Sequence, residues 1–188
     1  SVILSTMKAG DHCVISDCSY GGTNRIMRTQ FLPLGMEFDF VDFRDLSAIE
    51  KAIKPNTKLI FSESPANPTL SLVDLDAVSA LAKKHSALHV CDSTFATPVI
   101  LRPMDHGCDL VIQSLTKYYD GHNITTGGAV VVKNQELADK VGLVQNMNGN
   151  IMTPWVAFIQ MQTAKTMPLR VKKQSDSAMK IATFLESH

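Results

Sequence analysis

The residues best suited to chemistry lie in the segment 109–128. An apolar run at 110–112 leads into Ser114, Thr116 and Lys117, and a glycine pair follows at 127–128. Hydroxyls and neighbouring backbone N–H groups suit a phosphate, and a lysine amine can form a Schiff base with a carbonyl. A phosphate and a carbonyl on one small molecule indicate pyridoxal phosphate, so we expect this cofactor to bind here.

Three further residues could serve the same cofactor. Asp92 follows an apolar run, and a carboxylate beside the pyridine nitrogen would favour its protonated form. Asn67 stands between two prolines, which restrict the backbone on both sides of it. Tyr20 follows another apolar run and offers a flat ring. Ligands of open α/β sheets sit beyond the carboxyl ends of the strands, so we expect these residues to surround one site.

The elements that must position these residues alternate along the chain. Apolar runs predict six strands, at 12–16, 36–41, 57–62, 87–91, 109–114 and 128–132. Helical periodicity and turn signals predict a first helix that stops at Gly10, and a helix that follows a tight loop at the glycine pair 21–22 and runs to about Leu32. Further helices are predicted at 46–53, 74–85, 135–145, 154–165 and 171–188. The alternation up to residue 93 predicts a mainly parallel sheet with helices on both faces.

Composition excludes several classes of protein. The chain has 188 residues, zero net charge and a pI near 7.0, which favours neither nucleic acid nor an anionic membrane as a partner. No apolar run reaches transmembrane length, and we expect a cytoplasmic protein. The histidine and cysteine spacings match no metal site, so no metal is expected. The four cysteines lack CxxC spacing and are predicted to be free thiols, mostly buried.

A nicotinamide-dependent oxidoreductase is the main alternative for this fold class. It requires a G-x-G-x-x-G sequence between the first strand and helix. The glycine pairs at 21–22 and 127–128 do not match that pattern, which argues against this class.

Four motifs, SYGGTNR, ESPANPT, DSTFATP and SLTKYYDGHN, occur in order along nearly the whole chain. Together they resemble the trans-sulfuration family of pyridoxal-phosphate enzymes in cysteine and methionine metabolism. The resemblance implies an aspartate-aminotransferase-like fold, in which residues 1–188 form most of the cofactor-binding large domain. It also implies a homotetramer. The apolar start and helical end of the chain suggest that the family's N-terminal arm and C-terminal domain lie outside it.

The resemblance also implies roles for the cofactor-binding residues. Lys117 would hold pyridoxal phosphate as a Schiff base and act as the base above the substrate's α-carbon. Ser114 and Thr116 would bind the phosphate, Asp92 would pair with the pyridine nitrogen, and Tyr20 would stack on the ring.

The resemblance further assigns substrate contacts, although it does not fix one reaction. Asn67 would contact the phenolic oxygen of the cofactor and the substrate carboxylate, and Arg25 stands where some members place a substrate-facing arginine. Methionine gamma-lyases carry a cysteine where this chain has Gly22. We therefore expect a sulfur amino acid as substrate and favour γ-elimination of cystathionine to cysteine, 2-oxobutanoate and ammonia. The alternatives are cystathionine gamma-synthase or O-acetylhomoserine sulfhydrylase (γ-replacement), methionine gamma-lyase, and a non-catalytic fragment.

Overall fold

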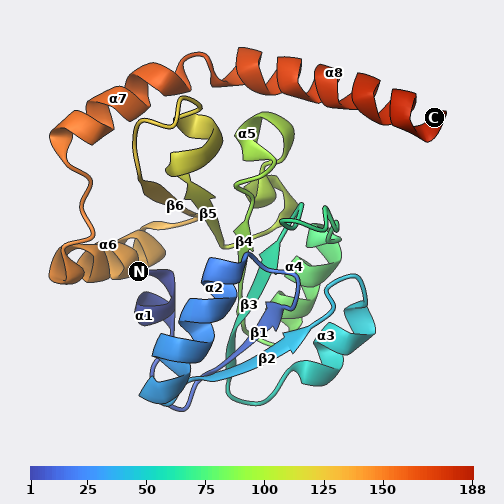
Figure 1. Cartoon of the computed structure of the whole chain (residues 1–188). Helices are drawn as coiled ribbons and strands as arrows, with labels where there is room; N and C mark the ends of the chain where they lie inside the picture. Colours follow the sequence, from blue (N-terminus) through green and yellow to red (C-terminus); the bar gives the residue numbers. More distant parts are fainter.

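The computed structural model describes all residues, 1–188, and is built around one six-stranded sheet in the order β2-β1-β3-β4-β5-β6 (Figure 1). The strands are β1 (His12–Ser16), β2 (Glu37–Val41), β3 (Thr57–Glu63), β4 (Leu88–Asp92), β5 (Leu110–Ser114) and β6 (Gly128–Val132). The first five strands are parallel, and β6 pairs antiparallel to β5. All six predicted strands are present, and the prediction of a mainly parallel sheet is confirmed.

Helices precede, connect and follow these strands. The α-helices are α1 (Val2–Thr6), α2 (Gly21–Ile26), α3 (Leu46–Ala52), α4 (Leu75–Lys84), α5 (Thr97–Ile100), α6 (Gln135–Asn148), α7 (Pro154–Ala164) and α8 (Met167–Glu186). The shorter turns are the π-helical η1 (Met27–Phe31) and η4 (Leu115–Tyr119) and the 3₁₀-helical η2 (Leu32–Leu34) and η3 (Pro103–His106).

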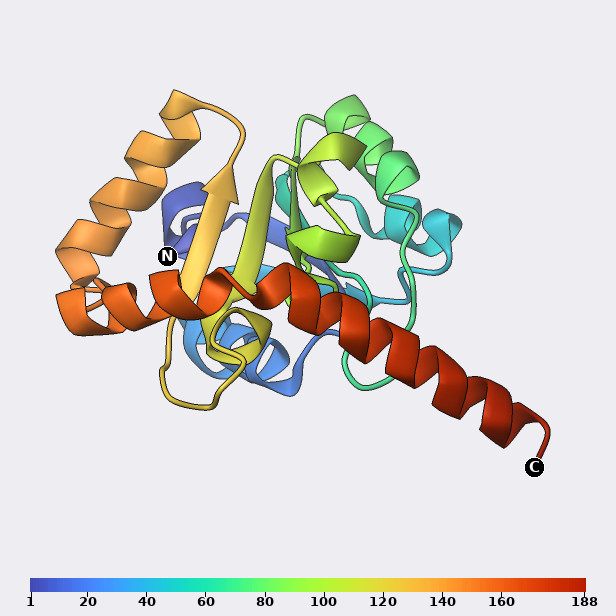
Figure 2. The same ribbon diagram turned by 90° about the horizontal axis from the view of Figure 1, so that it is seen from above.

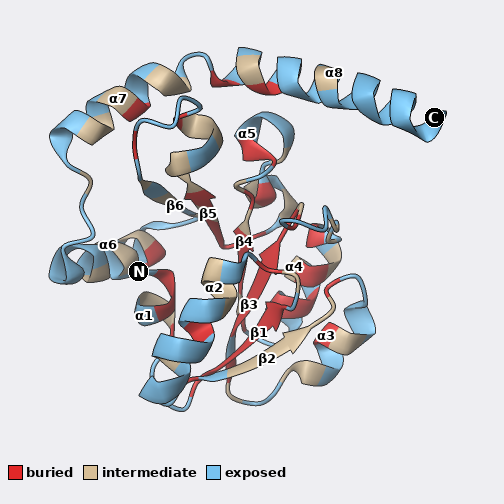
Figure 3. Cartoon of the chain, in the orientation of Figure 1, coloured by how far each residue is buried: buried red, intermediate tan, exposed pale blue.

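Both faces of the sheet are covered, because successive strand residues point to opposite sides. In β1, Ile15 packs into a core that also holds residues of α1, η1 and α6, whereas Val14 packs into a second core with α3 and α4. Ile15 and Val14 are both 0% exposed, and the central strands are buried along most of their length (Figure 3). Burying one such side chain contributes about 1.5–3 kcal/mol to folding.

The structure differs from the sequence predictions at several helix ends. Helix α1 ends at Thr6 rather than at Gly10, because Met7 is already extended; Gly10 instead occupies the turn before β1 with φ +86°. The glycine pair 21–22, predicted as a loop, instead begins α2, and the predicted helix to Leu32 changes to a π-turn at Met27. Helix α8 starts at Met167, with a proline in its first turn, rather than at residue 171.

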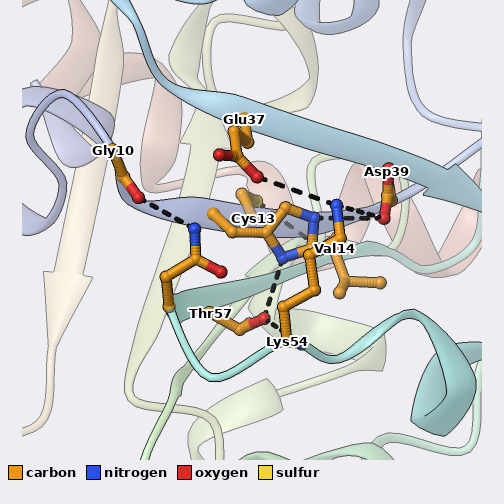
Figure 4. A network of polar contacts seen from close by, with 9 residues as sticks. Gly10, Cys13, Val14, Glu37, Asp39, Lys54 and Thr57 are labelled. Carbon is orange, nitrogen blue, oxygen red and sulfur yellow. Dashed lines mark hydrogen bonds and ion pairs between the residues drawn. The ribbon is translucent and has the colours of Figure 1, made fainter.

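A polar network joins three strands at the amino-terminal edge of the sheet (Figure 4). His12 of β1 is fully buried, and its Nδ1 lies 2.8 Å from Thr57 Oγ1 of β3. Its Nε2 lies 3.3 Å from Asp39 Oδ2 of β2, without the alignment of a hydrogen bond. Lys54 Nζ lies 2.9 Å from the same carboxylate oxygen. Burial, and then the charge of Lys54, lower the pKa of His12 below its usual 6.5.

The last two helices cross the molecule above the sheet (Figures 1 and 2). The C-terminal part of α8 extends beyond the sheet and is almost entirely exposed (Figure 3). Exposed apolar side chains occur along both helices, including Trp155 (68% exposed) and Leu169 (74% exposed). None of the helices combines the length and apolar character needed to cross a bilayer.

Candidate active site

A cavity of about 850 Å³ lies at the carboxyl ends of the parallel strands. Six of the seven residues singled out from the sequence border it: Tyr20, Asn67, Asp92, Ser114, Thr116 and Lys117. They come from the segments after β1 and β3, the last residues of β4 and β5, and the turn after β5. Because these four strands run parallel, their ends meet at one edge, which is where open α/β sheets bind ligands.

Lys117 lies in the turn η4, which interrupts regular helical geometry. Its own backbone is not helical (φ −96°, ψ −113°). The N–H groups of Leu115 and Thr116 both donate to Gly127 O, at 2.9 Å and 3.3 Å, which fastens the turn to the loop before β6. The Lys117 amine makes no hydrogen bond or ion pair with the protein, and the side chain borders the cavity. The amine is therefore available to a ligand.

Arg170 of α8 holds the other side of the same turn. Its Nη1 donates to Tyr118 O at 2.8 Å, and its Nη2 donates to Tyr119 O at 3.3 Å and Thr163 O at 3.0 Å. Gly121 leaves room for this side chain: its φ is +63°, and a Cβ there would lie 2.0 Å from Arg170 Nη1. No sequence pattern connects Arg170 with Lys117, because 53 positions separate them and only the fold brings them together.

A buried aspartate orders the loop that closes the cavity beyond the lysine. Asp120 Oδ2 accepts hydrogen bonds from the N–H groups of His122 (3.1 Å) and Ile124 (2.9 Å), and its Oδ1 accepts one from Thr125 Oγ1 (2.8 Å). Burial disfavours the charge of Asp120, but these hydrogen bonds outweigh burial and lower its pKa. This role was not predicted from the sequence.

Asp92 presents one free carboxylate oxygen to the cavity. Its Oδ1 accepts a hydrogen bond from Thr94 N at 2.9 Å, whereas no protein group donates to its Oδ2. Burial raises the pKa of Asp92, and the hydrogen bonds from Thr94 oppose that rise. Thr94 also connects the two strands, because its Oγ1 accepts from Ser114 N at 2.8 Å. We did not predict Thr94, whose only signal is its place two residues after a strand-end aspartate.

Glu63 connects two of the loops around the cavity. Its Oε2 accepts from Tyr20 N at 2.6 Å, and its Oε1 accepts from Asn67 N at 2.9 Å. Burial raises the pKa of Glu63 above its usual value, although both hydrogen bonds favour the charged form. One carboxylate at the end of β3 thus fixes the backbone positions of both Tyr20, after β1, and Asn67, after β3.

Tyr20 and Arg25 differ in their relation to the cavity. Tyr20 borders it and is 50% exposed. A Cβ at Gly22 would lie 2.5 Å from Cε1 of the Tyr20 ring, so this ring position depends on a glycine there. Arg25 is exposed near the end of α2 and does not border the cavity.

The donor groups fit pyridoxal phosphate. The cavity offers an unpaired amine at Lys117, hydroxyls at Ser114 and Thr116, and the Tyr20 ring. The free oxygen of Asp92 is the most specific feature, because a largely buried carboxylate favours a cationic partner such as a protonated pyridine nitrogen.

Comparison with known protein families agrees with this geometry. The model of the Cys/Met metabolism PLP-dependent enzymes matches residues 1–188. The chain belongs to this family. Membership confirms the predicted cofactor, pyridoxal phosphate, and the predicted resemblance.

Individual relatives carry several different names. Cystathionine gamma-lyase of Bacillus subtilis is 40% identical over 188 residues, which are 100% of this chain and 50% of that protein. A probable cystathionine gamma-synthase of Herpetosiphon aurantiacus is 38% identical over 188 residues, again 100% of this chain and 59% of the relative. Further relatives at similar identity are named cystathionine beta-lyases. The chain thus spans about half the length of the curated relatives it matches.

Solved structures confirm the predicted fold class. The crystal structure of cystathionine gamma-lyase from Lactobacillus plantarum complexed with L-serine superposes with a TM-score of 0.97 at 40% identity. The match covers 100% of this chain and 49% of that one. The mainly parallel sheet covered by helices therefore has the fold that the sequence motifs indicated.

Proposed function

We propose that the full-length protein is a pyridoxal-phosphate-dependent carbon–sulfur lyase that converts cystathionine to cysteine, 2-oxobutanoate and ammonia. The observation that carries this proposal is the pairing, in one cavity, of an unpaired amine (Lys117) with a free carboxylate oxygen (Asp92). In this proposal residues 1–188 form the cofactor-binding large domain, and the N-terminal arm and C-terminal domain belong to the rest of the protein.

The cofactor and these two residues divide the chemistry between them. Pyridoxal phosphate, when bound, withdraws electrons from the α-carbon of an attached amino acid and so makes its proton removable. The Asp92 carboxylate keeps a proton on the pyridine nitrogen, which maintains that withdrawal. Lys117 accepts the α-proton and, because its side chain is flexible, can move protons between neighbouring carbons as the sulfur leaves.

The remaining cavity residues bind and orient. The Ser114 and Thr116 hydroxyls contact the phosphate, although Thr116 Oγ1 also donates to Gly127 O at 3.2 Å. Tyr20 covers the cofactor ring, and Asn67 contacts its phenolic oxygen and the substrate carboxylate. Glu63 accepts hydrogen bonds from the backbone N–H groups of both Tyr20 and Asn67, so it positions the ring-covering residue and the amide residue relative to each other.

Two residues of α2 favour cystathionine over methionine. The short distance between a Cβ at Gly22 and the Tyr20 ring disfavours the cysteine that methionine gamma-lyases carry there. We further propose that Arg25 contacts the distal carboxylate of cystathionine, which methionine lacks.

Arg25→Ala should then raise the KM for cystathionine. Arg28→Ala is the matched control, because that guanidinium stacks on Phe40 at 3.8 Å. Equal KM changes in both variants would remove Arg25 from this role.

We also propose that the full-length protein is a homotetramer. The exposed apolar side chains of α7 and α8, such as Trp155, Phe158 and Leu169, provide surface for further protein to cover. Sedimentation of the full-length protein at the mass of an active monomer would contradict this proposal.

Product analysis of the full-length enzyme tests the reaction itself. The enzyme is given L-cystathionine, O-acetylhomoserine with cysteine, and L-methionine separately. Rapid release of 2-oxobutanoate and cysteine from cystathionine supports the proposal. Release of pyruvate and homocysteine would instead identify a β-lyase, cystathionine formation a γ-synthase, and dominant methionine cleavage a methionine lyase. Absence of any turnover with cofactor bound would indicate a non-catalytic protein.

A further inference from the structure

A second cavity lies at the opposite edge of the sheet, and a cysteine forms part of its wall. Its volume is about 870 Å³, and it is bordered by residues of α4 and η3, the start of β4, the segment before β5 and the end of β6. Cys108 and Ser79 both belong to this wall. A cavity of this size holds a small organic molecule. None of the residues assigned to the proposed reaction borders it.

Cys108 lies beside a buried histidine. Its Sγ is 3.3 Å from His89 Nδ1, and that nitrogen is also 2.7 Å from Ser79 Oγ. Ser79 Oγ is in turn 3.9 Å from Cys108 Sγ. Cys108 is 2% exposed and His89 is 0% exposed. The thiol, the hydroxyl and the imidazole therefore form a closed triangle, with the histidine behind the cavity wall.

The hydrogen bonds of His89 indicate which ring nitrogen can accept a proton. Ser62 Oγ lies 2.9 Å from His89 Nε2 and 3.3 Å from Val90 O. When its hydrogen is directed to Val90 O, it accepts from Nε2–H, and Nδ1 is then the acceptor that faces Ser79 and Cys108. The thiol proton can reach Nδ1 directly or through the Ser79 hydroxyl, which leaves a thiolate beside an imidazolium.

Cys91 is a second thiol next to Cys108, and the pKa values of the two thiols shift in opposite directions. Hydrogen bonding from Cys91, and then from His89 and Ser79, lowers the pKa of Cys108 although burial raises it. The pKa of Cys91 is raised well above its usual value by the same contact and by burial. Of the two sulfurs, Cys108 is the one that lies against His89 Nδ1 and Ser79 Oγ, and its pKa is the one that is lowered.

Most charged groups around the second cavity are already paired. The pairs are Asp109 with Lys133, His106 with Asp76, and Asp105 with Arg102. Lys83 is the only cavity residue of either charge without such a partner. This balance suits a neutral or zwitterionic ligand better than a multiply charged one.

We propose that Cys108 exchanges reversibly with a small, neutral or zwitterionic disulfide that enters the second cavity. The thiolate attacks one sulfur of the disulfide, whose S–S bond breaks as a new one forms to Cys108. The other half leaves as a thiolate and takes a proton from water. Cys108 is thereby oxidised and the small disulfide is reduced to one thiol. This proposal does not depend on the reaction proposed for the first cavity.

Two other cysteines of the chain serve as internal references. Cys13 is 0% exposed and borders neither cavity, and burial raises the pKa of its thiol. Cys18 is partly exposed, and burial and then Asp17 raise its pKa. An ordinary thiol with a pKa above the working pH loses reactivity about tenfold for each unit of pH decrease.

The test treats the full-length holoprotein with 4,4′-dithiodipyridine, a small neutral disulfide, at pH 6, 7 and 8. Peptide mapping then gives the rate at each cysteine. At pH 6 Cys108 should react at least ~10-fold faster than Cys18 and nearly as fast as at pH 8, because its thiolate persists. Cys13 should stay unlabelled. The proposal is overturned if Cys108 is labelled only under conditions that also label Cys13. It is equally overturned if the labelling rate of Cys108 falls with pH as steeply as that of Cys18.

Two variants separate activation of the thiol from simple access to it. Ser79→Ala keeps the cavity open but removes the hydroxyl that hydrogen-bonds to Cys108 Sγ, and should slow the pH 6 reaction several-fold while the rate at pH 9 is kept. Cys108→Ser should abolish the fast label and leave the Cys18 rate unchanged. An unchanged pH 6 rate in a folded Ser79→Ala protein would contradict stabilisation of the Cys108 thiolate by the Ser79 hydroxyl, and a fast label that survives Cys108→Ser would contradict the site.

Discussion

Asp92 carries a charge that the protein itself does not neutralise, since only Thr94 donates to its carboxylate. Asp92→Asn keeps the shape and removes the charge. We expect turnover to fall far more than cofactor occupancy. The lost charge-assisted contact costs on the order of 1.5–3 kcal/mol of cofactor binding, whereas proton removal at the α-carbon loses the electron withdrawal that drives it. Turnover and bound cofactor are measured on the same preparation.

Asp109→Asn is the matched control for this prediction. Asp109 is a buried aspartate at the other edge of the sheet, paired with Lys133. Its replacement should lower stability without changing turnover per bound cofactor. Near-normal turnover of Asp92→Asn would remove Asp92 from its proposed role.

Individual residues differ in how far the sequence could predict them. Asp92 and Ser114 were recognisable because each ends a buried strand, and Lys117 because it comes three residues after one; the carboxyl ends of parallel strands meet. Thr94 and Arg170 were not, because their partners are distant in the chain and are backbone groups that no side-chain pattern reveals. Arg25 was placed by resemblance alone, and the structure leaves it outside the cavity.

At the scale of elements, Arg170 joins α8 to the turn that carries Lys117. Lysine in its place keeps the charge but cannot reach the carbonyls of Tyr118, Tyr119 and Thr163 together. Arg170→Lys should therefore destabilise the protein by about 1–3 kcal/mol and weaken cofactor retention. Urea unfolding and cofactor loss on dialysis measure the two effects.

Lys172→Ala, two residues further along α8, provides the comparison. Lys172 is exposed and makes no hydrogen bond or ion pair. We expect no change in either measurement. Equal behaviour of the two variants would show that α8 does not hold the Lys117 turn.

The strands could be predicted from the sequence more closely than the helices. The residues of β1 are buried on both faces, and such strands give a continuous apolar run that marks their bounds. The edge strand β6 is only partly buried but is also apolar throughout, so its bounds were predicted as well. Short helices such as α5 and η3 have too few residues for a periodic pattern. The π-turn within 27–31 depends on packing and has no signal in the sequence.

For the molecule as a whole, His12 links stability to pH. Because its pKa is lowered in the folded state, the unfolded chain binds more protons below pH 6.5. The contribution of His12 to stability is therefore complete above about pH 6.5 and decreases as the pH falls through that value. We expect the unfolding temperature to drop between pH 7 and 5.5, and His12→Asn to reduce this drop.

His106→Asn is the control for this pH effect. His106 is at the surface, and Asp76 raises its pKa, so its contribution has the opposite sign and decreases as pH rises. This variant should retain the acid-side drop of the parent protein. If His12→Asn shows the same drop as well, His12 is not its origin.

The attachment of the cofactor at Lys117 is the claim on which the whole account rests. Borohydride reduction of the full-length holoprotein fixes the link permanently, and peptide mapping then locates it. We predict a single labelled peptide with the modification on Lys117, and no label in Lys117→Ala. A label on another lysine, with the cofactor demonstrably bound, would contradict the account.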